Sequence, residues 1–299
     1  MSVDWKGIFP AITTPFAEDG SIDHAFLARH ARWLVDAGCA GIIPCGSLGE
    51  SATLRTEEKR AVLETLVGAV GERVPVIPGV AALSTDEAVA FARAAERAGC
   101  RGLMVLPPYV YSTDAREMHA HVAAVLVATP LPCMLYNNPV SYRTDFLPAE
   151  IAELCARHPN LTAVKESSGD VRRVTAIRAL VGDRLAVAIG VDDLVVEAIH
   201  AGATAWVAGL VNAFPKESVA LFELARRGDR ERAATIYRWF LPLLRMDVVP
   251  KFVQLIKLVQ ERVGMGSARV RPPRLPLVGA ELAAAEATID AALAAKVRA

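Results

Sequence analysis

One lysine and one tyrosine end apolar stretches of this sequence, at positions where reactive side chains are expected. Lys165 ends the run Leu161–Lys165, and Tyr136 ends the preceding run, Cys133–Tyr136. A lysine amine held among apolar side chains is favoured in its neutral form, which attacks carbonyl carbon to form a Schiff base. A phenol beside that amine can donate, accept and relay protons. The pair predicts Schiff-base chemistry with Lys165 as the nucleophile and Tyr136 as the acid and base.

Lys165 is the one lysine of seven that ends a strand-like run. The other six precede the first run, fall in helical patterns or belong to the C-terminal region: Lys6, Lys59, Lys216, Lys251, Lys257 and Lys296. The competing interpretation is a structural lysine that pairs with an acid such as Glu166. Position alone leaves both interpretations open, and the neighbouring strand ends favour catalysis.

A glycine-containing loop, Gly46-Ser47-Leu48-Gly49-Glu50, follows the second apolar run. Its glycines permit close backbone approach, and the Ser47 hydroxyl with adjacent N–H groups could hold a carboxylate. It is not a P-loop, because no Gly-Lys-Ser/Thr follows. Asn137, Asn138 and Asn212 are further candidates near strand ends, although asparagine in loops more often stabilises a turn.

These candidate residues come together only in a fold whose strands all end on the same face, and the alternating pattern of the sequence predicts such a fold. Eight short apolar runs alternate with amphipathic helical segments, and continuous apolar runs are typical of parallel strands buried on both faces. This predicts an α/β fold, a (β/α)8 TIM barrel, whose active site lies at the C-terminal ends of the strands. An open doubly wound sheet is the lesser alternative, because no GxGxxG follows the first run. The expected strands are Gly7–Thr13, Gly41–Cys45, Pro75–Val80, Gly102–Leu106, Cys133–Tyr136, Leu161–Lys165, Leu185–Ile189 and Ala203–Ala208.

The C-terminal region departs from this alternation. From residue 230 the pattern indicates helices alone, at Arg230–Met246, Pro250–Val263 and Glu281–Val297. No Ser/Gly-rich linker separates them from the preceding residues. We therefore expect residues 1–229 to form the barrel that carries the active site, and residues 230–299 to form a helical segment packed on it rather than an independent domain.

Composition excludes several classes of function. Lys plus Arg equals Asp plus Glu, at 33 each, so the chain offers no electrostatic footprint for nucleic acid or an anionic membrane. The five dispersed cysteines favour free thiols over a disulfide framework, and no histidine ends a strand, so no metal site is expected. The N-terminus lacks a signal-peptide pattern, which favours a cytoplasmic protein.

Three motifs resemble the dihydrodipicolinate synthase and N-acetylneuraminate lyase family: GSLGES after the second run, YNNP after the fifth and VKESSGD at the sixth. The resemblance spans nearly the whole chain. It implies a class I Schiff-base lyase, dehydratase or synthase, a homotetramer (a dimer of dimers), that acts on a small 2-oxo acid or cyclic imino acid without metal or organic cofactor.

The resemblance also assigns roles to individual residues. It implies that Lys165 forms the Schiff base and that Tyr136 is the acid and base. The hydroxyl of Ser47 and the backbone N–H groups of Ser47 and Leu48 would grip the substrate carboxylate. Tyr109 matches a tyrosine donated across the subunit interface, and Val207 matches a residue that lines the lysine pocket.

Two departures bear on the substrate. Dihydrodipicolinate synthases carry two threonines in the loop, where this chain has Ser47 and Leu48. Their arginine for aspartate semialdehyde follows YNxP closely, whereas Arg143 comes two residues later. Lysine biosynthesis is therefore not expected.

Segments of the C-terminal half favour one subgroup instead. LVNAFPKE, FLPLLRMD and GSARVRPPRLPL resemble the pyrroline-4-hydroxy-2-carboxylate deaminases of hydroxyproline breakdown. The alternatives with the same lysine are a 2-keto-3-deoxy-sugar-acid dehydratase and a pyruvate-dependent aldolase. A non-catalytic barrel that binds a keto acid is a further alternative from a different class.

Overall fold

The computed structural model describes residues 3–109 and 114–297. Seven parallel strands form one sheet in the order β1-β7-β6-β5-β4-β3-β2, so that the first and last strands along the chain are neighbours. The strands are β1 Gly7–Pro10, β2 Gly79–Val80, β3 Leu103–Val105, β4 Cys133–Asn137, β5 Leu161–Glu166, β6 Ala186–Ile189 and β7 Ala205–Ala208.

The expected second strand, Gly41–Cys45, is reduced to a short bridging segment that closes the barrel. Ile42 pairs in parallel with Val76, and Ile43 pairs with Ala11. Pro44 follows and has no N–H for the ladder, and Cys45 adopts a positive φ of 57° that turns the chain away. The (β/α)8 barrel is thus confirmed, with its expected second strand reduced to two bridging residues.

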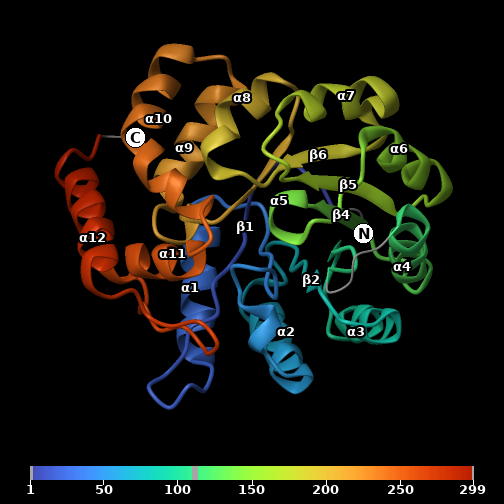
Figure 1. Cartoon of the computed structure of the whole chain (residues 1–299), viewed down its shortest axis with the longest axis horizontal. Helices are drawn as coiled ribbons and strands as arrows, with labels where there is room; N and C mark the ends of the chain where they lie inside the picture. Colours follow the sequence, from blue (N-terminus) through green and yellow to red (C-terminus); the bar gives the residue numbers. More distant parts are fainter. Residues whose placement is uncertain (1–2, 110–113, 298–299) are drawn as a thin grey trace.

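Helices surround the strands in Figure 1. Several begin after a side chain that caps the first turn: for example, Ser84 Oγ accepts from the N–H of Glu87, and Asp114 Oδ1 accepts from the N–H of Glu117. The helices are α1 His24–Asp36, α2 Thr56–Val70, α3 Thr85–Arg97, α4 Ala115–Val127, α5 Pro139–Tyr142, α6 Pro148–Arg157, α7 Arg172–Val181, α8 Val195–His200, α9 Pro215–Arg226, α10 Arg230–Leu244, α11 Phe252–Arg262 and α12 Gly279–Ala294.

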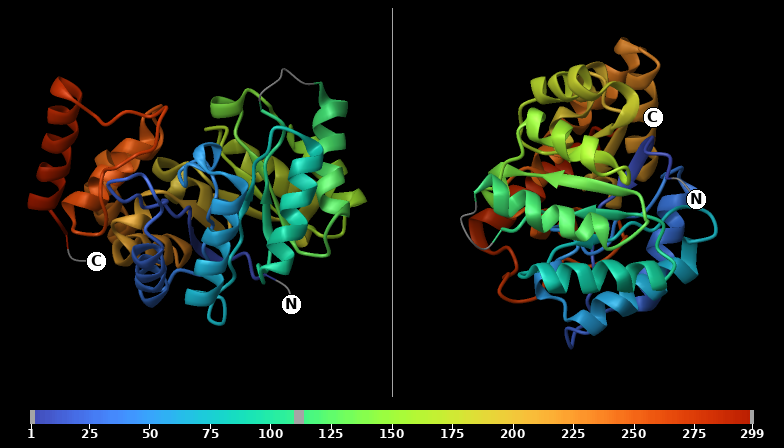
Figure 2. Two further views of the ribbon diagram at one scale, coloured as in Figure 1. Left: turned by 90° about the horizontal axis from the view of Figure 1, so that it is seen from below. Right: turned by 90° about the vertical axis from the view of Figure 1, so that its right-hand side faces the viewer.

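The last three helices pack together and on the barrel. Trp239 of α10 stacks on Phe240, meets Phe214 before α9 edge-on, and donates from Nε1 to the carbonyl of Ala292 in α12 at 2.8 Å. Figure 2 shows α12 at one end of the molecule and α4 at the other. Within the described residues, no helix combines the length and apolar character needed to span a bilayer.

Candidate active site

Lys165 and Tyr136 lie side by side, as their places at adjacent strand ends predict. They are register partners in the β4–β5 ladder, so both side chains face the inside of the barrel. The amine Nζ of Lys165 lies 4.2 Å from the centroid of the Tyr136 ring. Both residues are buried, with 7% and 4% of their surface exposed. An amine and a phenol therefore share one enclosed space at the barrel mouth.

The alternative partner of Lys165, Glu166, faces the other way. Successive side chains of a strand alternate between its faces. The Glu166 carboxylate accepts from the N–H of Ser168 at 2.7 Å and from Asn137 Nδ2 at 3.3 Å, and burial raises its pKa. Lys165 has no ion pair with Glu166, nor with any other described residue. The structural pairing proposed as the alternative is absent.

The Ser47 loop presents donors at the same mouth. The Ser47 hydroxyl forms a short hydrogen bond with the hydroxyl of Tyr142, from α5. Among the residues that the structure describes, the backbone N–H groups of Ser47 and Leu48 have no acceptor. The Leu48 side chain is buried. Two free N–H groups beside a hydroxyl form a suitable cradle for an anion such as a carboxylate.

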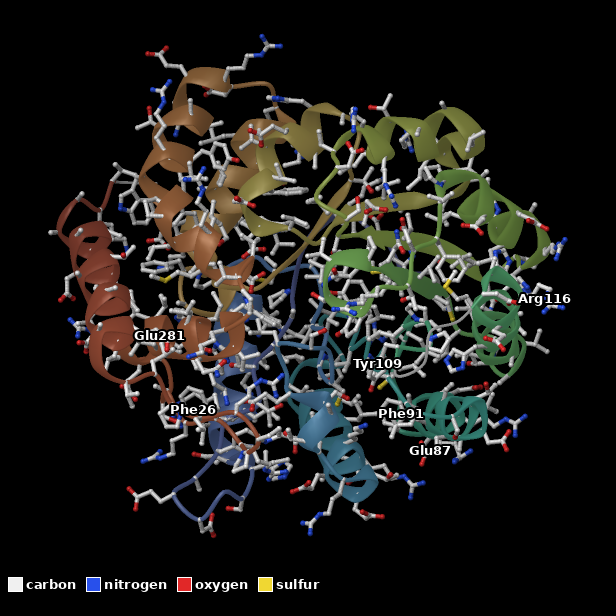
Figure 3. All side chains as sticks on the ribbon, viewed as in Figure 1. Phe26, Glu87, Phe91, Tyr109, Arg116 and Glu281 are labelled. Carbon is white, nitrogen blue, oxygen red and sulfur yellow. The ribbon has the colours of Figure 1, made fainter. Side chains whose placement is uncertain are left out.

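Three tyrosine rings form a contiguous group over Lys165. The Tyr142 ring lies 5.3 Å from Tyr109 and 5.9 Å from Tyr136, measured between centroids. Figure 3 places Tyr109 towards the centre of the view, whereas Arg116 lies at its edge. Burial raises the pKa of Tyr109 and that of Tyr142, which favours the protonated phenols as hydrogen-bond donors. Tyr109 contacts Tyr142 of its own chain.

Tyr142 was missed by the sequence analysis. Its only signal is its position between YNNP and Arg143, where related synthases place an arginine. Arg143 itself is exposed and takes a positive φ of 59° after α5. The Tyr136 hydroxyl accepts from Asn138 Nδ2 at 2.8 Å.

The other two asparagine candidates are structural. Asn137 bonds to both backbone groups of Phe146, which fixes the chain after α5. Asn212 Nδ2 donates to the carbonyls of Ala11 and Gly209, at 2.8 Å each. Turn stabilisation is therefore confirmed for this pair.

The inward positions at the ends of β5, β6 and β7 leave room beside Lys165. A Cβ on Gly190 would lie 2.2 Å from Lys165 Cε and 2.2 Å from Ser167 Oγ. The side chains of Lys165 and Ser167 therefore fit only because residue 190 is glycine. Ser167 Oγ is buried without a hydrogen-bond partner in the described residues. The register aligns Lys165 with Ala188 of β6 and Ala205 of β7, and Val207 is the next residue of β7 on the same face as Ala205.

Two buried carboxyl groups lie on the β7 side of Lys165, and the sequence analysis identified neither. Asp192 belongs to the short 3-10 helix η3, Asp192–Leu194, after β6. Asp247 belongs to η5, Arg245–Asp247, which packs against η3. It is part of the C-terminal extension, the helical segment of residues 230–299. Asp247 is the last residue of FLPLLRMD, a segment to which the sequence analysis gave no chemical role, and only the tertiary structure brings both carboxyl groups to the mouth.

A buried ion pair fixes the Ser47 loop to the extension. Lys257 Nζ of α11 lies 2.5 Å from Glu50 Oε1, and both side chains are almost completely buried, at 2% and 0% exposed. The N–H of Arg271 donates to Glu50 Oε2 at 3.1 Å. The extension therefore supports the loop that presents Ser47.

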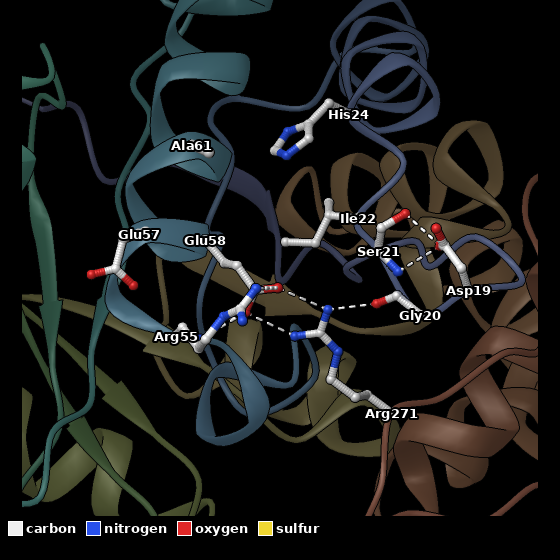
Figure 4. Close-up of a pocket in the computed structure, with 10 residues that line it drawn as sticks. All are labelled: Asp19, Gly20, Ser21, Ile22, His24, Arg55, Glu57, Glu58, Ala61 and Arg271. Atoms are coloured by element: carbon white, nitrogen blue, oxygen red, sulfur yellow. Dashed lines mark hydrogen bonds and ion pairs between the residues drawn. The ribbon is translucent and has the colours of Figure 1, made fainter.

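A surface pocket of about 540 Å³ lies apart from this site, between the loop before α1 and the start of α2 (Figure 4). Arg271 crosses it and donates to Glu58 and to the carbonyl of Gly20. None of the sequence-predicted site residues lines this pocket, so we do not associate it with the chemistry. The described residues contain no group of three His, Cys, Asp or Glu side chains suited to a metal ion.

The sequence matches the model of the dihydrodipicolinate synthetase family over residues 4–292. It is 34% identical to the 4-hydroxy-tetrahydrodipicolinate synthase of Methanospirillum hungatei, over 91% of this chain and 93% of that protein. It is 32% identical to the enzyme of the same name from Agrobacterium fabrum, over 97% of each chain.

Solved structures agree over the same length. Dihydrodipicolinate synthase DapA-2 from Bacillus anthracis superposes with a TM-score of 0.92 at 28% identity, over 99% of this chain and 100% of that chain. YagE, a prophage protein of this family from E. coli K12 in complex with pyruvate, superposes with a TM-score of 0.91 at 27% identity, over 97% and 99% of the two chains.

Proposed function

Because this chain belongs to the dihydrodipicolinate synthetase family, we propose that it is a Schiff-base enzyme that converts Δ1-pyrroline-4-hydroxy-2-carboxylate to 2,5-dioxopentanoate and ammonia. Membership of the family makes it a lyase-type enzyme with a small substrate. The observation that carries the proposal is the Lys165 amine 4.2 Å from the Tyr136 ring, inside a closed barrel mouth.

The chemistry starts at the imine carbon of the substrate. Lys165 attacks C2, and transimination opens the ring and leaves the ring nitrogen as a primary amine on C5. The substrate carboxylate binds at the Ser47 hydroxyl and the free N–H groups of Ser47 and Leu48. This places C2 against Lys165 and its neighbour C3 close to the phenol of Tyr136.

Elimination follows from the Schiff base. The protonated imine acidifies C3, and Tyr136, or a water that it orients, removes a C3 proton to give an enamine. The enamine expels the C4 hydroxyl as water and forms a double bond between C3 and C4. Tautomerisation moves unsaturation to C5. Hydrolysis of the two imines then releases ammonia from C5, frees the lysine from C2 and leaves 2,5-dioxopentanoate. Substrate plus one water balances product plus ammonia.

Two features support this substrate over that of a synthase. Leu48 replaces the second loop hydroxyl of the synthases, and its buried side chain offers no polar group to a second carboxylate. Tyr142, rather than an arginine, contacts Ser47. A site without that arginine suits a substrate with a single carboxylate.

Purified protein supplied with Δ1-pyrroline-4-hydroxy-2-carboxylate tests the proposal. Ammonia and 2,5-dioxopentanoate are followed together, the latter with an excess of a dehydrogenase that oxidises it. We expect both products in equal amounts, and none from Lys165→Ala. Pyruvate-borohydride labelling of Lys165 without either product would retain Schiff-base chemistry and reject this substrate.

The same assay separates the alternatives. A 2-keto-3-deoxy-sugar-acid dehydratase would release water and no ammonia, and an aldolase would release pyruvate. A non-catalytic keto-acid-binding barrel would be labelled by borohydride without turnover. Light scattering tests the accompanying proposal that the protein is a homotetramer in which Tyr109 reaches a neighbouring subunit's site.

A further inference from the structure

The carboxyl group of Asp247 reaches the barrel mouth from the C-terminal extension. It lies against Gly209, at the next inward-facing position after Val207 on β7. A Cβ on Gly209 would lie only 2.0 Å from Asp247 Oδ1. The carboxyl group therefore fills the place that a side chain at the end of β7 would occupy.

Asp247 has a buried oxygen without a partner, in contrast to its neighbour Asp192. The Asp192 carboxylate accepts from Trp206 Nε1 at 2.8 Å, from the N–H of Leu210 at 2.8 Å and from the N–H of Gly209. Asp247 Oδ1 is buried and has no hydrogen-bond partner among the described residues. Three donors stabilise charge on Asp192, so a proton shared by the two carboxyl groups rests on Asp247.

The electrostatics agree with this geometry. Burial, followed by the charge of Asp192, raises the pKa of Asp247 well above its ordinary value, while the charge of Lys165 opposes the shift. Burial raises the pKa of Asp192 to about 6, and its hydrogen bonds and Lys165 oppose that shift. The direction of this shift and the missing partner of Oδ1 both favour the protonated form of Asp247, which lies within electrostatic range of Lys165.

Lys165 has different groups on its two sides. The hydroxyl groups of Tyr136, Tyr142 and Ser47 gather on its β4 side. Asp247 lies on the opposite side, at β7. In a substrate whose carboxylate binds at Ser47, whose C2 is bound to Lys165 and whose C3 lies near Tyr136, the carbons beyond C3 extend away from these three hydroxyl groups, towards β6 and β7.

We propose that Asp247 is a catalytic acid that contacts the C4 hydroxyl of the substrate and protonates it as it leaves. This rests on the proposed function, because it needs a hydroxyl on C4. As the enamine electrons form the C3–C4 double bond, the C4–O bond breaks and the Asp247 proton joins the leaving oxygen to give water. Asp247 becomes a carboxylate and regains its proton from solvent before the next turnover.

Borohydride trapping with two 2-oxo acids tests the contact without requiring turnover. Pyruvate has no C4, whereas 4-hydroxy-2-oxobutanoate carries a hydroxyl there. In Asp247→Asn we expect the half-saturating concentration of 4-hydroxy-2-oxobutanoate to rise about three- to tenfold, the effect of one hydrogen bond, and that of pyruvate to change less than about twofold. Labelling by pyruvate also shows that the variant retains a folded site.

Turnover of Δ1-pyrroline-4-hydroxy-2-carboxylate tests the acid role. In Asp247→Asn, kcat should fall by about 10²- to 10⁴-fold with a smaller change in KM, while exchange of the C3 proton with solvent deuterium continues. The matched control is Asp183→Asn, which removes an exposed carboxylate that pairs with Arg178 before β6 and should leave both assays unchanged.

Thermal melting distinguishes a catalytic from a structural Asp247. Because Oδ1 has no partner and burial opposes its charge, Asp247→Asn should keep or raise Tm, whereas loss of a structural carboxylate would lower it. The inference would be overturned if Asp247→Asn kept the wild-type kcat and the wild-type ratio of half-saturating concentrations for the two 2-oxo acids. A different outcome is that the wild type makes no ammonia from the pyrroline substrate, while Asp247→Asn traps 4-hydroxy-2-oxobutanoate poorly and pyruvate normally. That result would reject the proposed substrate and retain the contact between Asp247 and the C4 hydroxyl.

Discussion

Lys257 and Glu50, 207 positions apart in the chain, form a buried ion pair that joins the C-terminal extension to the substrate loop. Lys257 Nζ also donates to the carbonyl of Arg269, and it lies 4.4 Å from the centroid of the Phe16 ring. Glu50 takes a positive φ of 55° at the end of the loop. The conformation of the Ser47 loop therefore depends on residues outside the barrel.

Removal of one partner of this pair should destabilise the protein and loosen the loop. In Lys257→Met, Glu50 keeps a charge that is fully buried, and we expect a loss of about 3–5 kcal/mol in the free energy of unfolding. The half-saturating concentration of pyruvate in borohydride trapping should rise as well. Urea unfolding measures the first effect.

The double variant Glu50→Gln/Lys257→Met is the control for that prediction. It removes both charges together, so it should recover a large part of the lost stability. If Lys257→Met unfolded at the same urea concentration as the wild type, the pair would not support the loop.

The sequence predicted the residues that local rules can place. Lys165 and Tyr136 end consecutive apolar runs, and the rule that parallel strands end at one mouth was enough to bring them together. The ladder register confirms this proximity.

Long-range relationships escaped the same reasoning. Lys257 was interpreted as one of several tail lysines, because nothing in its helix indicates a partner 207 positions away. Asp247 lies in a short 3-10 turn between helices, and its approach to Gly209 depends on how α10 and α11 pack. Tyr142 is the third residue after YNNP, and its contact with Ser47 exists only once α5 has formed.

Tyr136→Phe should separate Schiff-base formation from turnover. The ring that lies over Lys165 remains, so pyruvate-borohydride labelling should continue, slowly. The phenol that moves the C3 proton is lost, and we expect kcat to fall by about 10²- to 10⁴-fold. Lys165→Ala should abolish labelling altogether, as judged by mass spectrometry of the trapped protein. Wild-type turnover in Tyr136→Phe would remove its proposed role.

The hydrogen bond between Ser47 and Tyr142 should make their substitutions non-additive. Ser47→Ala and Tyr142→Phe each remove one hydroxyl of the same bond. We expect each to lower kcat/KM, and the double variant to be little worse than either single one, with a coupling of about 0.5–3 kcal/mol. Steady-state kinetics of the four proteins measure the coupling. Additive losses would mean that the two hydroxyl groups act independently.

The buried His30 should limit stability in acid. Its Nε2 lies 2.9 Å from the carbonyl oxygen of Asn212, which fixes the neutral tautomer with Nε2 as donor, and its Nδ1 is buried without a partner in the described residues. Burial lowers the pKa of His30 from 6.5 to about 4. The unfolded chain therefore binds a proton at a higher pH than the folded protein does.

The sign of the effect follows from this difference. Above pH 6.5 His30 is neutral in both states and costs nothing. As the pH falls from 6.5 through 4, the unfolded state gains a proton that the folded state does not, and about 3 kcal/mol of stability is lost. Asp192 acts in the opposite direction, because its raised pKa adds stability as the pH falls through about 6.

Comparison of the wild type with His30→Gln separates the effect of His30 on stability from that of the buried carboxyl groups. His30→Gln retains a donor for the Asn212 carbonyl and does not titrate, while Asp192 and Asp247 are the same in both proteins. Urea unfolding between pH 7 and pH 4 should show a steeper loss of stability in the wild type than in His30→Gln. Parallel curves would mean that His30 is protonated in the folded protein at its ordinary pKa, and that its burial in the structure is not maintained in solution.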